Sequence, residues 1–213
     1  FSLNDALPIC QSYTAIVIMS VDRKGVFTIE NAYRLHRNDH EYKVNIIKEL
    51  FRLFKIQVAA ADWFYGQDVV TTLQGPAGFG QRMLGCINSG TLATTLSYKP
   101  KEIRVVLNKD MMVEEIFSLV KNQRIKFPAK GESWDRIHWL LEHFTSMEVK
   151  KVQKNENVYN KYVKGAVQND GLMAAIYAII AYKFIATSGF KGMETEKKTG
   201  MRPGPLLAYL PKM

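Results

Sequence analysis

Cysteine is almost absent from this chain. Its 213 residues include two cysteines, Cys10 and Cys86, which lie far apart and show no Cys-x-x-Cys spacing. Structural zinc sites need four closely placed thiolate or imidazole ligands, and small secreted domains depend on several disulfides. The sequence therefore argues against a disulfide framework and against a zinc site, and it is typical of a protein from a reducing compartment.

Long apolar runs and targeting signals are also missing. A membrane-spanning helix needs about 20 consecutive apolar residues, whereas the longest apolar stretch, residues 172–186, contains Lys183 and two tyrosines. Residues 1–11 lack the basic start that opens a secretory signal peptide. We therefore expect a protein that is neither secreted nor inserted in a membrane.

Several well-known catalytic motifs do not occur. The chain has no Gly-x-Ser-x-Gly nucleophile elbow, and the glycine-rich segment Gly75–Gly80 lacks the lysine of a nucleotide-binding P-loop. None of the four histidines shows metal-ligand spacing: His36, His40, His138 and His143. These absences argue against a serine hydrolase, an ATPase and a zinc protease. We expect His138 and His143 to be exposed or core-edge residues of a helix.

Positive charge is what the chain has in excess. The formal net charge is +9 and the pI is near 9.4, while 47% of the residues are hydrophobic. The hydrophobic content is enough for the core of one sizeable domain. A globular domain this basic is usually built to lie near a polyanion, of which nucleic acid is the commonest. Charge alone leaves DNA, RNA and a membrane surface as alternatives.

Hydrophobic periodicity predicts alternating strands and helices in the first third of the chain. We expect a strand pair at 12–21 and 26–35, joined by a turn at Asp22–Gly25, then an amphipathic helix at 43–54 and a buried strand at 56–61. A strand, a helix and another strand are typical of a β-sheet covered by helices. The fold class is therefore α/β.

The remaining two thirds continue the same alternation. The pattern predicts strands at 102–107 and 124–128, helices at 67–73, 110–122, 133–144 and 171–186, and a paired β-hairpin at 147–154 and 159–165. Residues 188–213 are rich in glycine, proline and lysine. We predict one domain over residues 1–187, followed by a flexible C-terminal tail over residues 188–213.

Three aspartates occupy positions at which chemistry is often placed. Asp62 ends the apolar strand, Asp170 precedes the apolar helix, and Asp5 precedes the first strand. Taken singly, Asp62 and Asp170 are well explained as helix N-caps and Asp5 as part of a frayed terminus. Together, carboxylates from strand ends and a helix start can converge at one edge of a sheet. Such a cluster suits two Mg²⁺ or Mn²⁺ ions and metal-dependent phosphodiester cleavage.

Basic residues gather in the second half of the chain. They bracket the strand at 124–128 and fill the predicted hairpin, where Tyr159 and Tyr162 lie among them. The usual fate of such a charge run is a solvated face. A lysine-rich hairpin is also suited to follow a phosphate backbone without reading sequence. The predicted DNA-binding residues are Lys121, Arg124, Lys126, Lys150, Lys151, Lys154, Lys161 and Lys164.

Three segments in this order resemble a known family. They are Asp62–Gly66 (DWFYG), Ile125–Pro128 (IKFP) and Asn169–Tyr177 (NDGLMAAIY). Over roughly residues 1–186 the chain resembles the nuclease domain of the terminase large subunit of tailed bacteriophages. The resemblance implies an RNase H-like fold, in which a central mixed β-sheet is flanked by helices, with an added β-hairpin.

The same resemblance implies a set of metal ligands. The family holds two metal ions with three acids, of which the second falls on Asp62 and the third on Asp170. The first falls on Asp5, although the family's Asp-Trp-Gly is here Asp5-Ala6-Leu7. Asp68 is a candidate auxiliary ligand. The implied cofactors are Mg²⁺ or Mn²⁺.

The resemblance also implies a biological role. It predicts a largely sequence-nonspecific endonuclease that cuts concatemeric viral DNA during genome packaging in the host cytoplasm. Implied partners are double-stranded DNA, a terminase ATPase motor, the small terminase subunit and the portal. Two alternatives remain at this point. One is another RNase H-like nuclease of the resolvase or transposase type, and the other is a DNA-binding or docking module with an incomplete catalytic site.

Overall fold

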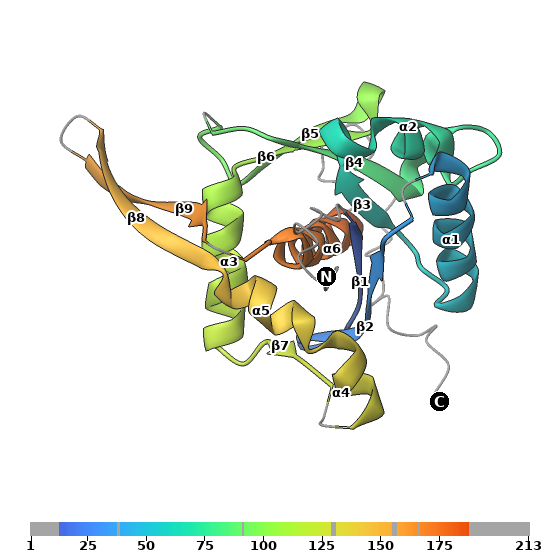
Figure 1. Cartoon of the computed structure of the whole chain (residues 1–213). Helices are drawn as coiled ribbons and strands as arrows, with labels where there is room; N and C mark the ends of the chain where they lie inside the picture. The colour runs from blue at the N-terminus through green and yellow to red at the C-terminus, as the bar shows by residue number, and fades with distance from the viewer. Residues whose placement is uncertain are drawn as a thin grey trace, which may run out of the picture.

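Two mixed β-sheets, a separate β-hairpin and six α-helices make up the part of the chain that the structure describes (Figure 1). The structure is a computed structural model, and it describes residues 13–37, 39–90, 92–128, 131–154, 157–165 and 167–187. Asp5 and the tail predicted at residues 188–213 lie outside these ranges. The α/β class predicted from hydrophobic periodicity is confirmed.

The first sheet contains the predicted strand pair. Strand β1 (Thr14–Val21) pairs antiparallel with β2 (Phe27–Leu35), and β2 pairs parallel with β7 (Ile125–Lys126), which gives the order β1-β2-β7. The turn between β1 and β2 is stabilised by Asp22, whose Oδ1 accepts hydrogen bonds from the amides of Lys24 and Val26 at 2.8 and 2.9 Å. Gly25 supplies the positive φ of +72° that this turn requires.

The second sheet contains two strands that the periodicity did not predict. Its order is β3-β4-β6-β5, with β3, β4 and β6 parallel and β5 antiparallel to β6. The strands are β3 (Ala59–Asp62), β4 (Met83–Asn88), β5 (Leu96–Lys99) and β6 (Arg104–Leu107). The unpredicted strands are β4 and β5. The described strands therefore form two sheets where one central sheet was expected.

The helices begin and end near the predicted positions, with one break. They are α1 (His40–Leu53), α2 (Trp63–Gln74), α3 (Lys109–Lys121), α4 (Glu132–Ile137), α5 (Trp139–Thr145) and α6 (Asp170–Ala186). Short 3₁₀ turns span Gly80–Arg82 and Pro100–Glu102. The single helix expected at 133–144 is divided at His138 into α4 and α5. Asp39 caps α1 by accepting a hydrogen bond from the amide of Tyr42 at 2.8 Å.

Helix α6 lies in the middle of the molecule and packs against both β1 and β3 (Figure 1). Its sequence is apolar on all sides, which is typical of a buried helix, and Leu172, Ile176 and Ile179 are fully buried. Its 17 residues span about 25 Å, less than the ~30 Å of a bilayer core. Over the described ranges, no helix combines the length and the apolarity needed to cross a membrane.

The predicted hairpin is confirmed, and it projects from the body of the molecule (Figure 1). It consists of β8 (Met147–Lys154) and β9 (Asn157–Lys164). Its base is attached to α3, because the amide of Tyr162 donates a hydrogen bond to Oδ1 of Asp110 at 2.9 Å and the Tyr162 ring lies 5.9 Å from that of Phe117.

A large cavity separates the two sheets. Its volume is about 1400 Å³, and residues along the whole of β1 and β3 line it. Helix α1 borders the cavity with Ile47, Leu50 and Phe51, and α6 borders it with Met173, Tyr177 and Ala181. The candidate functional residues lie along the walls of this cavity.

Candidate functional site

Asp62 is fixed in place by two hydrogen bonds. It is the last residue of β3 and also the N-cap of α2, because its Oδ1 accepts from the amide of Tyr65 at 3.1 Å. Its Oδ2 accepts from the hydroxyl of Tyr177 at 2.8 Å. Each carboxylate oxygen has two acceptor positions, so each retains one for a ligand. The capping interpretation of Asp62 is correct, and it leaves the carboxylate able to bind a cation.

Asp170 is placed differently. The N-cap of α6 is Asn169, whose side chain makes no capping hydrogen bond, and Asp170 is the first helical residue. Asp170 is exposed, and its carboxylate accepts no hydrogen bond from another described residue. The N-cap interpretation of Asp170 was therefore wrong. The carboxylate lies at the positive end of the α6 dipole and interacts electrostatically with Tyr13 and His143.

Two of the predicted ligands line the same cavity, whereas the other two do not line it within the described residues. Asp62 and Asp170 both line it, together with Tyr13, Lys109 and Lys164. Asp68 lines a neighbouring shallow groove instead, and Asp5 lies outside the described residues. Among the described residues no group of three or more His, Cys, Asp or Glu side chains could hold a metal ion.

The two carboxylates are of the chemical kind that binds a hard divalent cation. Mg²⁺ is commonly bound by one or two carboxylates and completes its shell with water. Asp62 and Asp170 provide two such oxygen donors on one cavity, whereas a second ion would need a further acid. Binding of Mg²⁺ or Mn²⁺ by Asp62 and Asp170 therefore stays a prediction, as does the complete two-ion set.

Burial controls the protonation of the groups behind Asp62. Burial raises the pKa of the Tyr177 hydroxyl, and the adjacent Asp62 carboxylate raises it further. Burial likewise raises the pKa of the Cys86 thiol, with a second contribution from Asp62. Both groups consequently remain protonated and neutral. Tyr177 is therefore a permanent hydrogen-bond donor that holds the Asp62 carboxylate in one orientation.

His143 supports the first turn of α6, a role that the sequence interpretation missed. Its side chain is 4% exposed, and its Nδ1 accepts a hydrogen bond from the amide of Gly171 at 2.9 Å. The proton must then reside on Nε2, which lies 2.9 Å from the hydroxyl of Tyr13. Burial lowers the pKa of His143, and Asp170 acts in the opposite direction. The sequence feature that could have indicated the burial of His143 is its position beside Trp139, Leu140 and Phe144, which form the buried face of α5.

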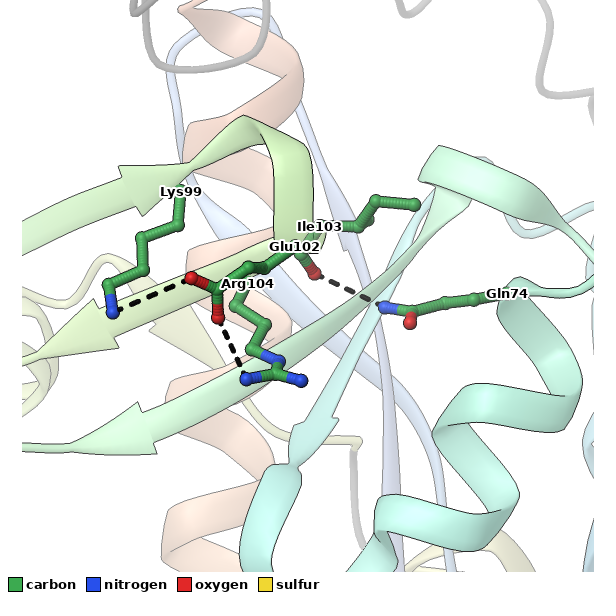
Figure 2. Close-up of polar contacts among 5 residues, drawn as sticks. All are labelled: Gln74, Lys99, Glu102, Ile103 and Arg104. Atoms are coloured by element: carbon green, nitrogen blue, oxygen red, sulfur yellow. Dashed lines mark hydrogen bonds and ion pairs between the residues drawn. The ribbon is translucent and has the colours of Figure 1, made fainter.

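The start of α2 is held by contacts around Trp63. The Arg104 guanidinium lies 3.6 Å from the centre of a Trp63 ring. Figure 2 shows Glu102 between Arg104 and Lys99, with Nη1 of Arg104 donating to Oε2 of Glu102 at 2.8 Å. Gly85 allows close packing on the other side, because a Cβ there would lie 2.6 Å from Cε3 of Trp63. Asp62 is thus followed by a residue that cannot easily move.

The end of α2 is attached to the same sheet. Nε2 of Gln74 donates to the carbonyl oxygens of Met83 and Ile103 at 2.9 and 3.2 Å, the second of which is drawn in Figure 2. These bonds join α2 to β4 and to the residue that precedes β6. Both ends of α2 are therefore fixed relative to the carboxyl end of β3.

The predicted basic residues fall into two groups. Lys164 lines the cavity, while Lys150, Lys151 and Lys161 are exposed on the hairpin. Lys150 lies directly opposite Lys161 in the β8–β9 register. Like charges at opposed positions destabilise a strand pair. An anion bound over Lys150 and Lys161 would therefore reduce their mutual repulsion. Tyr162 is buried at the hairpin base, and the side chains of Lys154 and Tyr159 lie outside the described parts of the structure.

The second basic group lies at the other end of the first sheet. Ile125 and Lys126 pair with Phe27 and Thr28 at the start of β2. This point is about 23 Å along β1 from the Tyr13 end, taking ~3.3 Å per residue. Nη2 of Arg124 donates to the carbonyl oxygen of Gly25 at 3.0 Å, so Arg124 stabilises the β1–β2 turn. The structure therefore separates Lys121, Arg124 and Lys126 from the two acids.

Comparison with known proteins identifies no relative of this chain. No protein-family model matches the chain, and searches of curated proteins and of solved structures also give no match. What the site can do chemically follows from the two carboxylates, their hydrogen-bond partners and the lysines beside them.

Proposed function

We propose that this chain is a metal-dependent DNA endonuclease with an RNase H-like fold. The observation that carries the proposal is the presence of Asp62 and Asp170, from the end of β3 and the start of α6, on the walls of one cavity with Lys164. Two carboxylates with free oxygens suit a hard cation, and an exposed lysine-rich hairpin suits a DNA backbone. The net charge of +9 favours a polyanionic substrate.

The residues have distinct roles in this reaction. Asp62, oriented by Tyr65 and Tyr177, and Asp170, at the first turn of α6, would hold Mg²⁺ or Mn²⁺. Divalent ions held by these residues would supply activation of the attacking water and neutralisation of charge on the departing 3′ oxygen. Lys164 and the hairpin lysines bind phosphates near the cut. These phosphate contacts carry no base readout, so cleavage is largely independent of sequence.

The proposal extends to the role implied by the family resemblance. In that role the domain cuts concatemeric viral DNA in the host cytoplasm and works with a terminase ATPase motor, a small terminase subunit and a portal. Asp5 then supplies the third acid. A different RNase H-like nuclease, such as a resolvase, would share the acids but prefer branched DNA over linear duplex.

Plasmid nicking in Mn²⁺ tests the proposal. Asp62→Asn and Asp170→Asn should each reduce cleavage at least about a hundredfold, because metal polarisation contributes several kcal/mol. Asp62→Asn keeps an oxygen that can accept from Tyr65, so its fold should survive. Asp135→Asn, an exposed residue of α4, is the matched control. Asp5→Asn and Asp68→Asn show whether either residue contributes a ligand.

One observation favours a second candidate function. Asp5-Ala6-Leu7 stands where the family has Asp-Trp-Gly, which suits a DNA-binding or docking module whose catalytic site is incomplete. The same experiment separates the two. A parent protein that binds duplex DNA but leaves the plasmid intact in Mn²⁺ would refute the nuclease and support the module.

A further inference from the structure

Two adjacent aromatic side chains are exposed at the start of α2. Phe64 is 68% exposed and Tyr65 is 93% exposed, and among the described Phe, Trp and Tyr residues they are the only ones in the exposed class. Aromatic side chains bring large apolar surface and usually bury it in a core or an interface. Exposed side by side, they indicate a surface that meets a ligand.

The fold holds both side chains in their exposed positions. Trp63, immediately before them, is buried between Gly85 and the Arg104 guanidinium. The Tyr65 amide is bound to Oδ1 of Asp62, and Gln74 attaches the far end of the helix to the sheet. Phe64 and Tyr65 therefore lie on a first turn of α2 that Asp62 caps and Trp63 anchors, ahead of a kink at Gly66, and this anchoring lowers the entropic cost of binding to them.

These aromatic residues are next to the candidate metal ligands. Tyr65 lines the cavity that contains Asp62 and Asp170. Tyr65 also lines the neighbouring shallow groove, together with Phe64, His40 and Thr72. A strand whose phosphate lies against a cation at Asp62 would therefore pass its next nucleotides over these rings.

Area and charge point to nucleobases as the ligand. A specific protein interface buries at least about 1,000 Å², whereas each aromatic side chain contributes about 150–250 Å². Two such rings are too small for a protein interface, but they match two stacked bases. The charge of +9, and Lys109 and Lys164 on the cavity that Tyr65 also lines, complement the phosphates that accompany those bases. Base stacking tolerates any sequence, because every base has a π-face.

We propose that Phe64 and Tyr65 form a stacking platform for unpaired bases that flank the cleaved phosphate. The proposal rests on the nuclease function and refines its substrate class. It assigns the enzyme a preference for DNA whose strands are separated at the cutting point, such as frayed ends or single strands. In a fully paired duplex the bases stack on one another and are not available to these rings.

Metal-free binding measured by fluorescence anisotropy tests the platform. The double variant Phe64→Ala/Tyr65→Ala should bind a short single-stranded oligonucleotide about ten- to a hundredfold more weakly than the parent. Its affinity for a blunt duplex should change less than about twofold, because phosphate contacts dominate there. Phe64→Tyr/Tyr65→Phe keeps both rings and should bind like the parent.

Two controls make the result specific to stacking. Val120→Ala removes an exposed apolar side chain on α3 and should leave single-strand affinity unchanged. An abasic oligonucleotide keeps the phosphates without the bases, so the parent and the alanine variant should bind it equally. An equal loss on single strand, duplex and abasic strand, or no loss on any of them, would overturn the platform.

The platform and the nuclease function can fail separately. The binding assay contains no metal and measures no cleavage, so loss of stacking in a protein that still cuts plasmid overturns the platform alone. Single-strand binding that depends on the two rings in a parent that never cuts overturns the nuclease function alone.

Discussion

The first turn of α6 and the β8–β9 hairpin carry different candidate functional groups and are held in opposite ways. Around α6, Leu172 and Ile176 are fully buried and His143 is 4% exposed, so Asp170 begins a helix with little freedom to shift. On the hairpin, Val149 is 55% exposed and the lysines face solvent. Metal ligands need accurate placement, whereas phosphate binding by lysine tolerates movement. The contrast fits a division in which the α6 region holds the metal ligands and the hairpin binds the substrate.

Truncation of an apolar side chain should give the largest difference in the free energy of unfolding between the two regions. Ile176→Ala should lower the free energy of unfolding by about 2–5 kcal/mol, because it leaves a cavity in a fully buried position. Val149→Ala removes an exposed side chain of the hairpin and should change it by less than about 0.5 kcal/mol. Urea unfolding followed by circular dichroism measures both values. Similar losses from the two variants would show that the hairpin is as firmly packed as α6.

The α6 region should show a dependence of stability on pH just below neutrality that the hairpin lacks. Burial lowers the pKa of His143 in the folded protein below the ordinary value of about 6.5. Above that value both states are neutral and stability is complete. As the pH falls below it, the unfolded chain binds a proton before the native state does, so stability declines by at most about 1.4 kcal/mol per pH unit.

Melting temperatures between neutral and mildly acidic pH check this effect. In the parent, protonation at Nδ1 would place a proton against the Gly171 amide. His143→Gln has no titrating ring, so its melting temperature should depend less on pH than that of the parent. Identical pH profiles for the parent and His143→Gln would assign the effect to other groups.

Charge removal on the hairpin should have the smallest effect on stability and a clear effect on DNA binding. Lys150→Gln/Lys161→Gln relieves a like-charge pair and should raise the free energy of unfolding by roughly 0.2–1 kcal/mol. The slope of log affinity against log salt for duplex DNA should fall by up to about 2, or about 0.9 per lost phosphate contact. Lys121→Gln/Lys126→Gln is the control at the far end of the sheet. An unchanged slope in the hairpin variant would remove the hairpin from the DNA-binding surface.

Strong periodicity explains which elements could be predicted from the sequence. The β1–β2 pair, α1 and α3 follow repeating apolar patterns, with a clear turn signal at Asp22–Gly25, and α6 is a continuous apolar run. Strand β4 was missed because glycine disfavours a strand prediction at Gly85, and β5 has only four residues. The missing Cβ at Gly85 leaves room for the Trp63 ring. This contact joins segments that are distant in the chain, so no local sequence pattern contains it. Long-range packing overrode local propensity at this point.

The candidate site shows the same limit. Two of the predicted acids lie on one cavity, because strand ends and helix starts are positions that topology brings together. The role of His143 depends on Gly171 and Tyr13, which are 28 and 130 residues away in the chain. Arg124 was predicted to bind DNA from its charge, but its contact with Gly25 shows it stabilising a turn. Charge indicates a class of partner, while geometry decides which basic residues can reach it.

The position of β1 and β3 also affects how the protein resists self-association. An unpaired strand edge is a template onto which another chain can add and start aggregation. Among the described strands, β1 pairs only with β2 and β3 only with β4, so each has a free edge. Helix α6 packs against both strands, so it restricts the approach of another chain to these two edges. Self-association through β1 or β3 should therefore increase when α6 unfolds.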